Sequence, residues 1–91
     1  MYTLVWTPRF TRAAEKFTKR HGGLREKFAD IIRDLEHDPF QPHLKYHHLG
    51  GKLNGVQAVS LTDSYRITLT VVVSDKEITL LDVGSHNEVY R

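Results

Sequence analysis

The chain has 91 residues and a formal net charge of +2, with 13 Lys and Arg against 11 Asp and Glu. We therefore expect one small domain, residues 1–91, whose charge permits an anionic partner without requiring one. The absence of cysteine excludes disulfides, thiolate metal sites and cysteine nucleophiles. The N-terminus lacks a signal-peptide pattern and no apolar run approaches the length of a membrane span, so we expect a cytoplasmic protein with no membrane partner.

The N-terminal half predicts a short strand followed by two helices. Residues 3–7 are β-prone, and Thr7 followed by Pro8 is typical of an N-cap and a first helical position. Apolar residues then recur at helical spacing in two segments, Phe10, Ala13, Ala14 and Phe17 in the first and Leu24, Phe28, Ile31, Ile32 and Leu35 in the second. Because only His21, Gly22 and Gly23 separate the segments, we expect an antiparallel helical hairpin. Its basic residues are either a solvated face or a phosphate-binding face.

The C-terminal half predicts strands. Extended segments are expected at 44–49, 56–62, 64–73 and 77–86, with a turn at Ser74–Lys76 between the last two. Along 64–73 the apolar residues occupy alternate positions, which indicates one apolar and one polar face, the polar face carrying Arg66, Thr68 and Thr70. The predicted fold is α+β: an N-terminal strand, a two-helix antiparallel hairpin, and a three- to four-stranded antiparallel sheet with both helices on one side.

Several classes of chemistry lack support in the sequence. His47 and His48 are adjacent, so in an extended segment they point to opposite sides and cannot easily hold one ion together, even with His43 nearby. There is no Gly-x-Ser-x-Gly elbow and no phosphate-binding glycine loop. We therefore expect no metal and no cofactor.

Metal-independent RNA cleavage needs fewer groups: a base for the ribose 2′-hydroxyl, a cation at the phosphate and an acid for the leaving oxygen. Candidates for these roles are Lys45, His47, His48, Lys52, Arg66, His86 and Tyr90. Arg66 projects from the polar strand face, where a free guanidinium would suit a phosphate. Alternatively, Arg66 forms a surface ion pair with a nearby acid, His86 starts a helix or turn, and Tyr90 only packs at the chain end.

Three segments resemble the RelE/ParE superfamily of bacterial type II toxins, and the likeness in size and element order covers nearly the whole chain. The segments are Leu44–Leu49, Ser64–Ile67 and Val83–Tyr90. The Gly84-Ser85-His86 sequence, followed by Val89-Tyr90, is similar to the ending of the YafQ-like branch of RelE-type mRNA interferases. The resemblance implies a toxin that cleaves mRNA on the ribosome and is held in check by a cognate antitoxin protein.

The resemblance also implies roles for individual residues. His86 falls on a catalytic histidine and Tyr90 on the aromatic residue that follows it. His47, with His48 as its alternative, falls on a histidine before the Gly50-Gly51 turn. Arg66 is expected to act with these residues at the phosphate, unless it matches a structural arginine. RNA contacts are expected from Lys45, His48, Lys52 and Arg91.

The chain departs from the YafQ pattern at three positions. Ser60 and Ser64 stand where that pattern has a histidine and an aspartate, and Asp82 stands near an arginine of the pattern. The loss of cations fits a second hypothesis slightly better, a ParE-like inhibitor of DNA gyrase without nuclease activity. A third hypothesis is a binding module whose basic helices face an acidic partner.

Overall fold

Five strands form one mixed sheet in residues 1–90, the part of the chain that this computed structural model describes. They are β1 (Thr3–Trp6), β2 (His47–His48), β3 (Gln57–Ser60), β4 (Tyr65–Val72) and β5 (Glu77–Ser85). Their order across the sheet is β1-β5-β4-β3-β2. β1 runs parallel to β5, and every other neighbouring pair is antiparallel.

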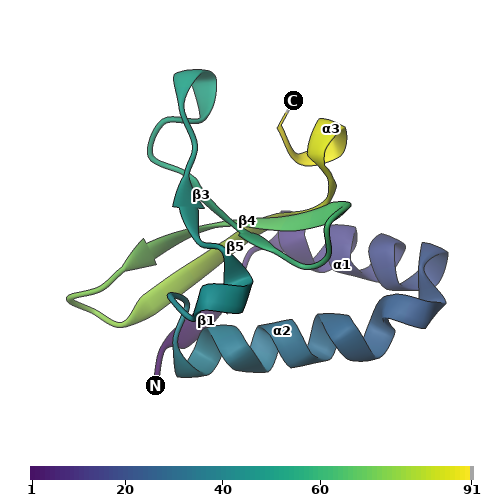
Figure 1. Cartoon of the computed structure of the whole chain (residues 1–91), viewed down its shortest axis with the longest axis horizontal. Coiled ribbons are helices and arrows are strands. Elements are labelled where there is room, and N and C mark those ends of the chain that lie inside the picture. Colours follow the sequence, from purple (N-terminus) through teal and green to yellow (C-terminus); the bar gives the residue numbers. More distant parts are fainter. Residues whose placement is uncertain (91) are drawn as a thin grey trace.

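Two helices cover one face of this sheet (Figure 1). They are α1 (Pro8–Arg20) and α2 (Arg25–His37), linked by the 3-10 helix η1 (Gly22–Leu24). The Thr7 hydroxyl accepts a hydrogen bond from the Phe10 amide at 3.1 Å and donates one to the Leu80 carbonyl at 2.7 Å, so the N-cap of α1 is also its attachment to β5. No helix within residues 1–90 combines the length and the apolar character needed to cross a membrane.

We call the sheet face away from α1 and α2 the outer face.

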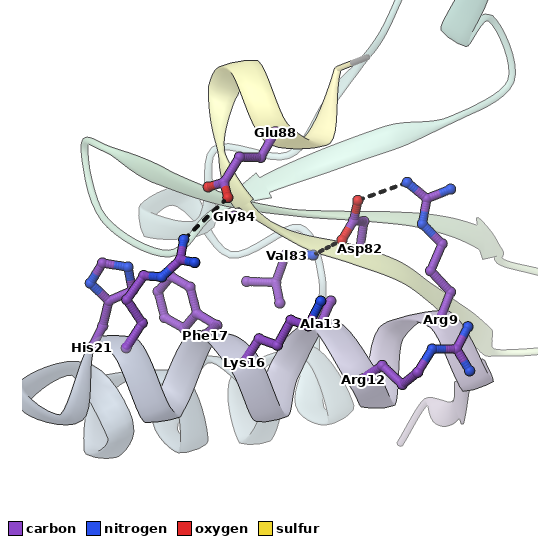
Figure 2. A pocket seen from close by; sticks show the side chains of 11 residues that line it. Arg9, Arg12, Ala13, Lys16, Phe17, His21, Asp82, Val83, Gly84 and Glu88 are labelled. Carbon is purple, nitrogen blue, oxygen red and sulfur yellow. Dashed lines mark hydrogen bonds and ion pairs between the residues drawn. The ribbon is translucent and has the colours of Figure 1, made fainter.

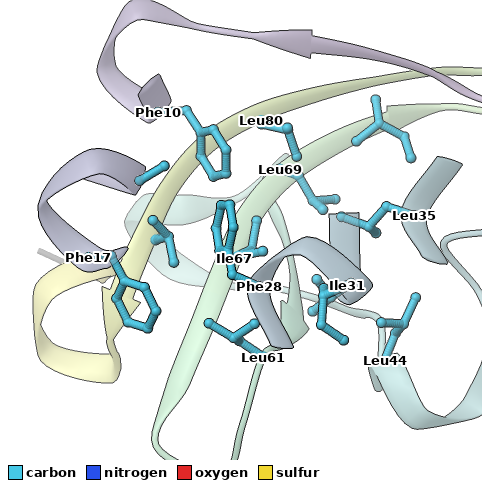
Figure 3. Packing of buried hydrophobic residues seen from close by; sticks show 14 residues of the cluster. Phe10, Phe17, Phe28, Ile31, Leu35, Leu44, Leu61, Ile67, Leu69 and Leu80 are labelled. Carbon is cyan, nitrogen blue, oxygen red and sulfur yellow. The ribbon is translucent and has the colours of Figure 1, made fainter. Parts of the chain in front are cut away.

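The helices and the sheet share one apolar core (Figure 3). It includes Phe10, Phe17, Phe28, Ile31 and Leu35 from the helices and Leu61, Ile67, Leu69, Ile78 and Leu80 from the sheet and its connections. The rings of Phe10 and Phe28 stack across the hairpin with centroids 6.2 Å apart. Each fully buried side chain of this kind contributes about 1.5–3 kcal/mol, so this core is the main source of stability. The predicted apolar stripes of both helices are confirmed, and so is the apolar face of β4 from Tyr65 to Val71. Val73, at the end of the predicted segment, lies beyond β4 and is exposed.

The α+β fold and the order of its elements are as predicted, but two details differ. The N-terminal strand joins the sheet in parallel, which makes the sheet five-stranded and mixed rather than purely antiparallel. The extended segment expected at 44–49 is reduced to β2, because the 3-10 helix η2 (Pro42–Leu44) precedes it and Lys45 is left-handed with φ 52°. Another 3-10 helix, η3 (Gly51–Leu53), follows β2.

A β-bulge interrupts the pairing of β4 with β5. Leu69 pairs with Leu80 and Thr68 pairs with Asp82, so Leu81 has no partner on β4. Leu80 is buried in the core, whereas Leu81 and Asp82 both line a hollow that also contains Thr68. The extra residue therefore turns Asp82 to the outer face, as bulges commonly re-aim a side chain.

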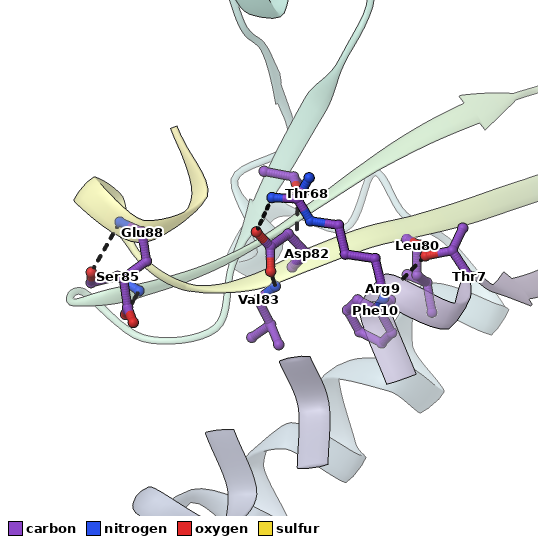
Figure 4. A network of polar contacts seen from close by, with 9 residues as sticks. All are labelled: Thr7, Arg9, Phe10, Thr68, Leu80, Asp82, Val83, Ser85 and Glu88. Carbon is purple, nitrogen blue, oxygen red and sulfur yellow. Dashed lines mark hydrogen bonds and ion pairs between the residues drawn. The ribbon is translucent and has the colours of Figure 1, made fainter. Parts of the chain in front are cut away.

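The short helix α3 (His86–Val89) follows β5 directly and is fixed by a capping box (Figure 4). The Ser85 hydroxyl accepts a hydrogen bond from the Glu88 amide at 3.3 Å, and the Glu88 carboxylate accepts one from the Ser85 amide at 2.8 Å. A Cβ at Gly84 would lie 3.1 Å from Glu88 Oε1, so glycine leaves room for the returning carboxylate. Val89 is buried and anchors the helix to the sheet.

We expect Ser85→Ala to lower the free energy of unfolding by about 1 kcal/mol, because it removes the acceptor that caps α3. Urea denaturation checks this. Asn87→Ala changes an exposed neighbour in the same helix and should stay within about 0.5 kcal/mol of the unsubstituted protein. Equal effects of the two substitutions would contradict the role of the cap.

Hydrogen bonds with Ser85 hold the pKa of Glu88 below its ordinary value; the bond from the Ser85 amide has the largest effect and the one with the Ser85 hydroxyl the next largest. The charges of Arg20 and His21 contribute less. Because this pKa is lower in the folded than in the unfolded state, the ionised Glu88 carboxylate stabilises α3 fully at pH values above the unfolded pKa. The stabilisation is lost as the pH falls through the folded-state pKa. In an NMR titration, the Ser85 amide should shift with a midpoint below that of a glutamate in an unstructured peptide. The shift should vanish in Glu88→Gln, and a midpoint at or above the peptide value would refute the assignment.

Candidate functional site

Three of the predicted site residues meet at one end of the sheet, and we call Arg66, His86 and Tyr90 the outer-face cluster. Arg66 Nη1 lies 3.4 Å from the Tyr90 hydroxyl, and the guanidinium carbon is 5.8 Å from the centre of the Tyr90 ring. The rings of His86 and Tyr90 are 4.3 Å apart between centroids and nearly perpendicular at 84°. The Tyr90 phenol is thus in contact with a cation on one side and an imidazole on the other.

Backbone geometry explains why these residues meet. The Ser85 cap makes His86 the first residue of α3, and Tyr90 follows four residues later, so both side chains lie on one side of the turn. Arg66 on β4 pairs with Gly84, immediately before the cap. The Gly84–Tyr90 segment that carried the family resemblance is therefore the segment that places His86 and Tyr90 beside Arg66.

Arg66 has no carboxylate partner within 4.0 Å among residues 1–90. Asp82 pairs instead with Arg9 at 3.0 Å, and Glu88 pairs with Arg20 at 3.7 Å. The alternative of a surface ion pair at Arg66 is therefore not seen in this part of the chain. Its partly exposed guanidinium contacts the Tyr90 ring and hydroxyl, which leaves most of its N–H donors available to a ligand.

The two adjacent histidines of β2 point to opposite faces. His47 pairs with Ala58, which pairs with Thr68, so His47 lies on the outer face about 10 Å, or two strand spacings, from β4. His47 Nδ1 lies 2.8 Å from the Lys45 carbonyl. Since a carbonyl only accepts, Nδ1 donates in this contact, which leaves Nε2 of this exposed side chain as the ring nitrogen available to a ligand. His48 lies on the helix side, 5.6 Å from the Tyr46 ring.

The remaining predicted contact residues are spread out. Lys45 is exposed next to β2, and Lys52 is exposed in η3, on the loop that rises from the outer face beside α3 (Figure 1). Arg91 lies outside the residues that the structure describes. No three His, Asp or Glu side chains within residues 1–90 are grouped so that they could hold a metal ion. Burial raises the pKa of Tyr46, next to His48.

A hollow of about 390 Å³ adjoins the outer-face cluster, and we call it the outer hollow. Its walls come from the loop after β2, from β4 and β5 and from α3: Leu53, Val56, Thr68, Leu81 and Val89, with Thr7, Arg9 and Asp82. Thr68 is two residues from Arg66 on the same strand face, and Val89 precedes Tyr90. A lining of apolar side chains with a few polar groups suits a flat group such as a nucleobase.

A second hollow of about 390 Å³ lies between α1 and the end of β5 (Figure 2). One side of α1 lines it with four cations, Arg9, Arg12, Lys16 and Arg20, which face the carboxylates of Asp82 and Glu88. The sequence showed these cations as a solvated or phosphate-binding face. It carried no local signal that two of them pair with acids more than sixty positions away, so the Arg9–Asp82 contact was missed.

No protein-family model matches the chain, and no curated protein matches it. Solved structures do match. YafQ from Escherichia coli BL21(DE3) superposes with a TM-score of 0.82 at 15% identity, covering 100% of both chains. A YoeB/ParE toxin from Agrobacterium tumefaciens matches with 0.75 at 25% identity, covering 92% of this chain and 98% of its own. The YoeB–YefM complex from Staphylococcus aureus matches with 0.71 at 15% identity, covering 94% and 98%. The chain therefore has the fold of the RelE/ParE-type toxins, as the resemblance predicted.

Proposed function

We propose that this protein is the toxin of a type II toxin–antitoxin system and that it cleaves messenger RNA on the ribosome without a metal ion. The observation that carries the proposal is the outer-face cluster. On a fold shared with YafQ and YoeB, Tyr90 contacts both Arg66 and His86 beside a hollow that suits a nucleobase.

The chemistry that fits this cluster is transfer of the phosphate to the ribose 2′-hydroxyl. A base removes the hydroxyl proton, the 2′-oxygen attacks phosphorus, and the 5′-oxygen leaves with a proton from an acid. An imidazole can give or take a proton near neutral pH, so His86 and the open Nε2 of His47 are the candidates for acid and base. Arg66 stabilises the charge that develops on the phosphate oxygens, and Tyr90 orients His86 or stacks on a base.

The partners of this function are the ribosome with its mRNA and a cognate antitoxin. A protein antitoxin is supported by the solved structure of YoeB in complex with YefM. The four cations along α1 offer an acidic segment of such a partner a complementary surface.

A ParE-like inhibitor of DNA gyrase is the second candidate, favoured by the 25% identity to a structure described as a YoeB/ParE toxin. In that case the outer-face cluster would bind without catalysing, and growth would stop while mRNA stayed intact. One measurement therefore distinguishes the two functions: whether the mRNA in growth-arrested cells is cleaved or intact.

We expect His86→Ala to reduce cleavage by about 10²- to 10⁴-fold, because it removes a proton-transfer group. The measurement is induced expression in a host without the antitoxin, with transcripts mapped by primer extension. His43→Ala is the matched control, since His43 is an exposed histidine whose Nε2 lies 2.8 Å from Asp34 on α2, away from the cluster. It should leave cuts and growth arrest unchanged.

The outcomes divide clearly. Codon-phased cuts that disappear only in His86→Ala support the interferase. Growth arrest with intact mRNA and trapped gyrase–DNA complexes would replace it with the gyrase inhibitor. Equal cleavage by His86→Ala and the unsubstituted protein would remove His86 from the mechanism.

The opposite orientation of the two β2 histidines yields a separate prediction. His47→Ala should slow ribosomal mRNA cleavage by at least about tenfold, because a proton-transfer group is lost from the outer face. His48→Ala should change the rate by less than about twofold, because its ring faces the helix side. Rates measured on programmed ribosomes with both purified variants test this, and a larger effect of His48→Ala would reverse the assignment.

A further inference from the structure

Arg9 occupies a particular place at the edge of the sheet. β1 pairs with β5 only as far as Trp6 and Leu80, so from Leu81 onward this edge of β5 has no strand beside it. The chain turns into α1 at Pro8, which sets Arg9 in the first turn beside this open edge. Arg9 lines both the outer hollow and the hollow behind it, so its side chain lies on the ridge between them.

Asp82 holds the end of this side chain (Figure 4). One carboxylate oxygen of Asp82 accepts the Val83 amide at 2.9 Å, and the other accepts Arg9 Nη2 at 3.0 Å. The side chain of Asp82 is only 16% exposed, whereas that of Arg9 is 71% exposed. The acid is therefore fixed by its own strand, and the guanidinium that it orients presents its remaining donors to solvent.

Stability does not explain this arrangement. An ion pair with one partner so exposed contributes little to folding, and a cation in the first turn of α1 lies at the unfavourable, positive end of the helix dipole. What the pair achieves is orientation, since one guanidinium N–H is used by Asp82 and the other donors stay available on a side chain that lines the outer hollow.

We infer that Arg9 binds a phosphate of the single-stranded RNA whose base enters the outer hollow, and that Asp82 is the positioning residue that holds Arg9 there. The inference rests on the proposed function and deepens it. It also explains the acid near a position where the YafQ pattern has an arginine: the cation comes from α1, and Asp82 directs it to the outer face.

The test is cleavage of mRNA on programmed ribosomes, with the single-turnover rate measured against protein concentration. Arg9→Ala should raise the half-saturating concentration about tenfold, change the maximal rate less than about threefold, and flatten the salt dependence of binding by about one phosphate contact. Arg9→Lys should recover part of the affinity. Arg12→Ala removes the same charge one turn further along α1 and should change half-saturation less than about twofold.

Asp82→Asn separates positioning from simple charge. It makes the surface more positive, so a purely electrostatic effect would tighten RNA binding, whereas loss of positioning should weaken it about three- to tenfold. Thermal unfolding midpoints close to that of the unsubstituted protein exclude misfolding as the cause.

Equal effects of Arg9→Ala and Arg12→Ala, or tighter RNA binding by Asp82→Asn, would overturn the inference about Arg9 and Asp82. The proposed function would still stand in that case if the unsubstituted protein cleaved mRNA and His86→Ala did not. Absence of cleavage by the unsubstituted protein would overturn both.

Discussion

The pairing of β5 between β1 and β4 is the constraint on which the rest of the molecule depends. Leu80 lies at the centre of this pairing, because its backbone pairs with Trp6 on one side and with Leu69 on the other. Its side chain is buried in the core, and its carbonyl accepts a hydrogen bond from the Thr7 hydroxyl that caps α1. One position thus joins the parallel edge strand, the central antiparallel pair and the first helix. Both hollows lie just beyond it, where β1 has ended and β5 is paired with β4 only.

The bulge at Leu81 and the capping box at Ser85 convert that strand into a site. The bulge turns Asp82 outward, where it meets Arg9, and the cap folds the chain back so that Tyr90 meets both Arg66 and His86. The bulge and the cap are both local features of the backbone, and each changes the direction of side chains at the end of β5. A short terminal helix would not hold side chains in place by itself, but its cap and the buried Val89 attach it to the sheet.

The departures from the YafQ pattern have different structural meanings. Ser60 pairs with Arg66 across β3 and β4, so a small side chain stands beside the guanidinium that the cluster presents. Asp82 is not an isolated negative charge at the site, because Arg9 reaches it from α1. The negative charge of Asp82 therefore does not by itself determine the electrostatic potential of this surface, because its partner Arg9 is 73 positions away in the sequence.

The sequence by itself determined the fold class, the helix limits set by Thr7-Pro8 and the glycine pair, and the apolar faces of the helices and β4, since periodicity and caps are local properties of the chain. It also pointed to His86, Tyr90 and Arg66 through their motifs. Only the tertiary structure decided that β1 joins β5 in parallel, that Arg9 holds Asp82, and that His47 rather than His48 lies on the outer face. Strand order, register and long-range ion pairs depend on which distant segments bury their apolar faces together, and no local pattern encodes that choice.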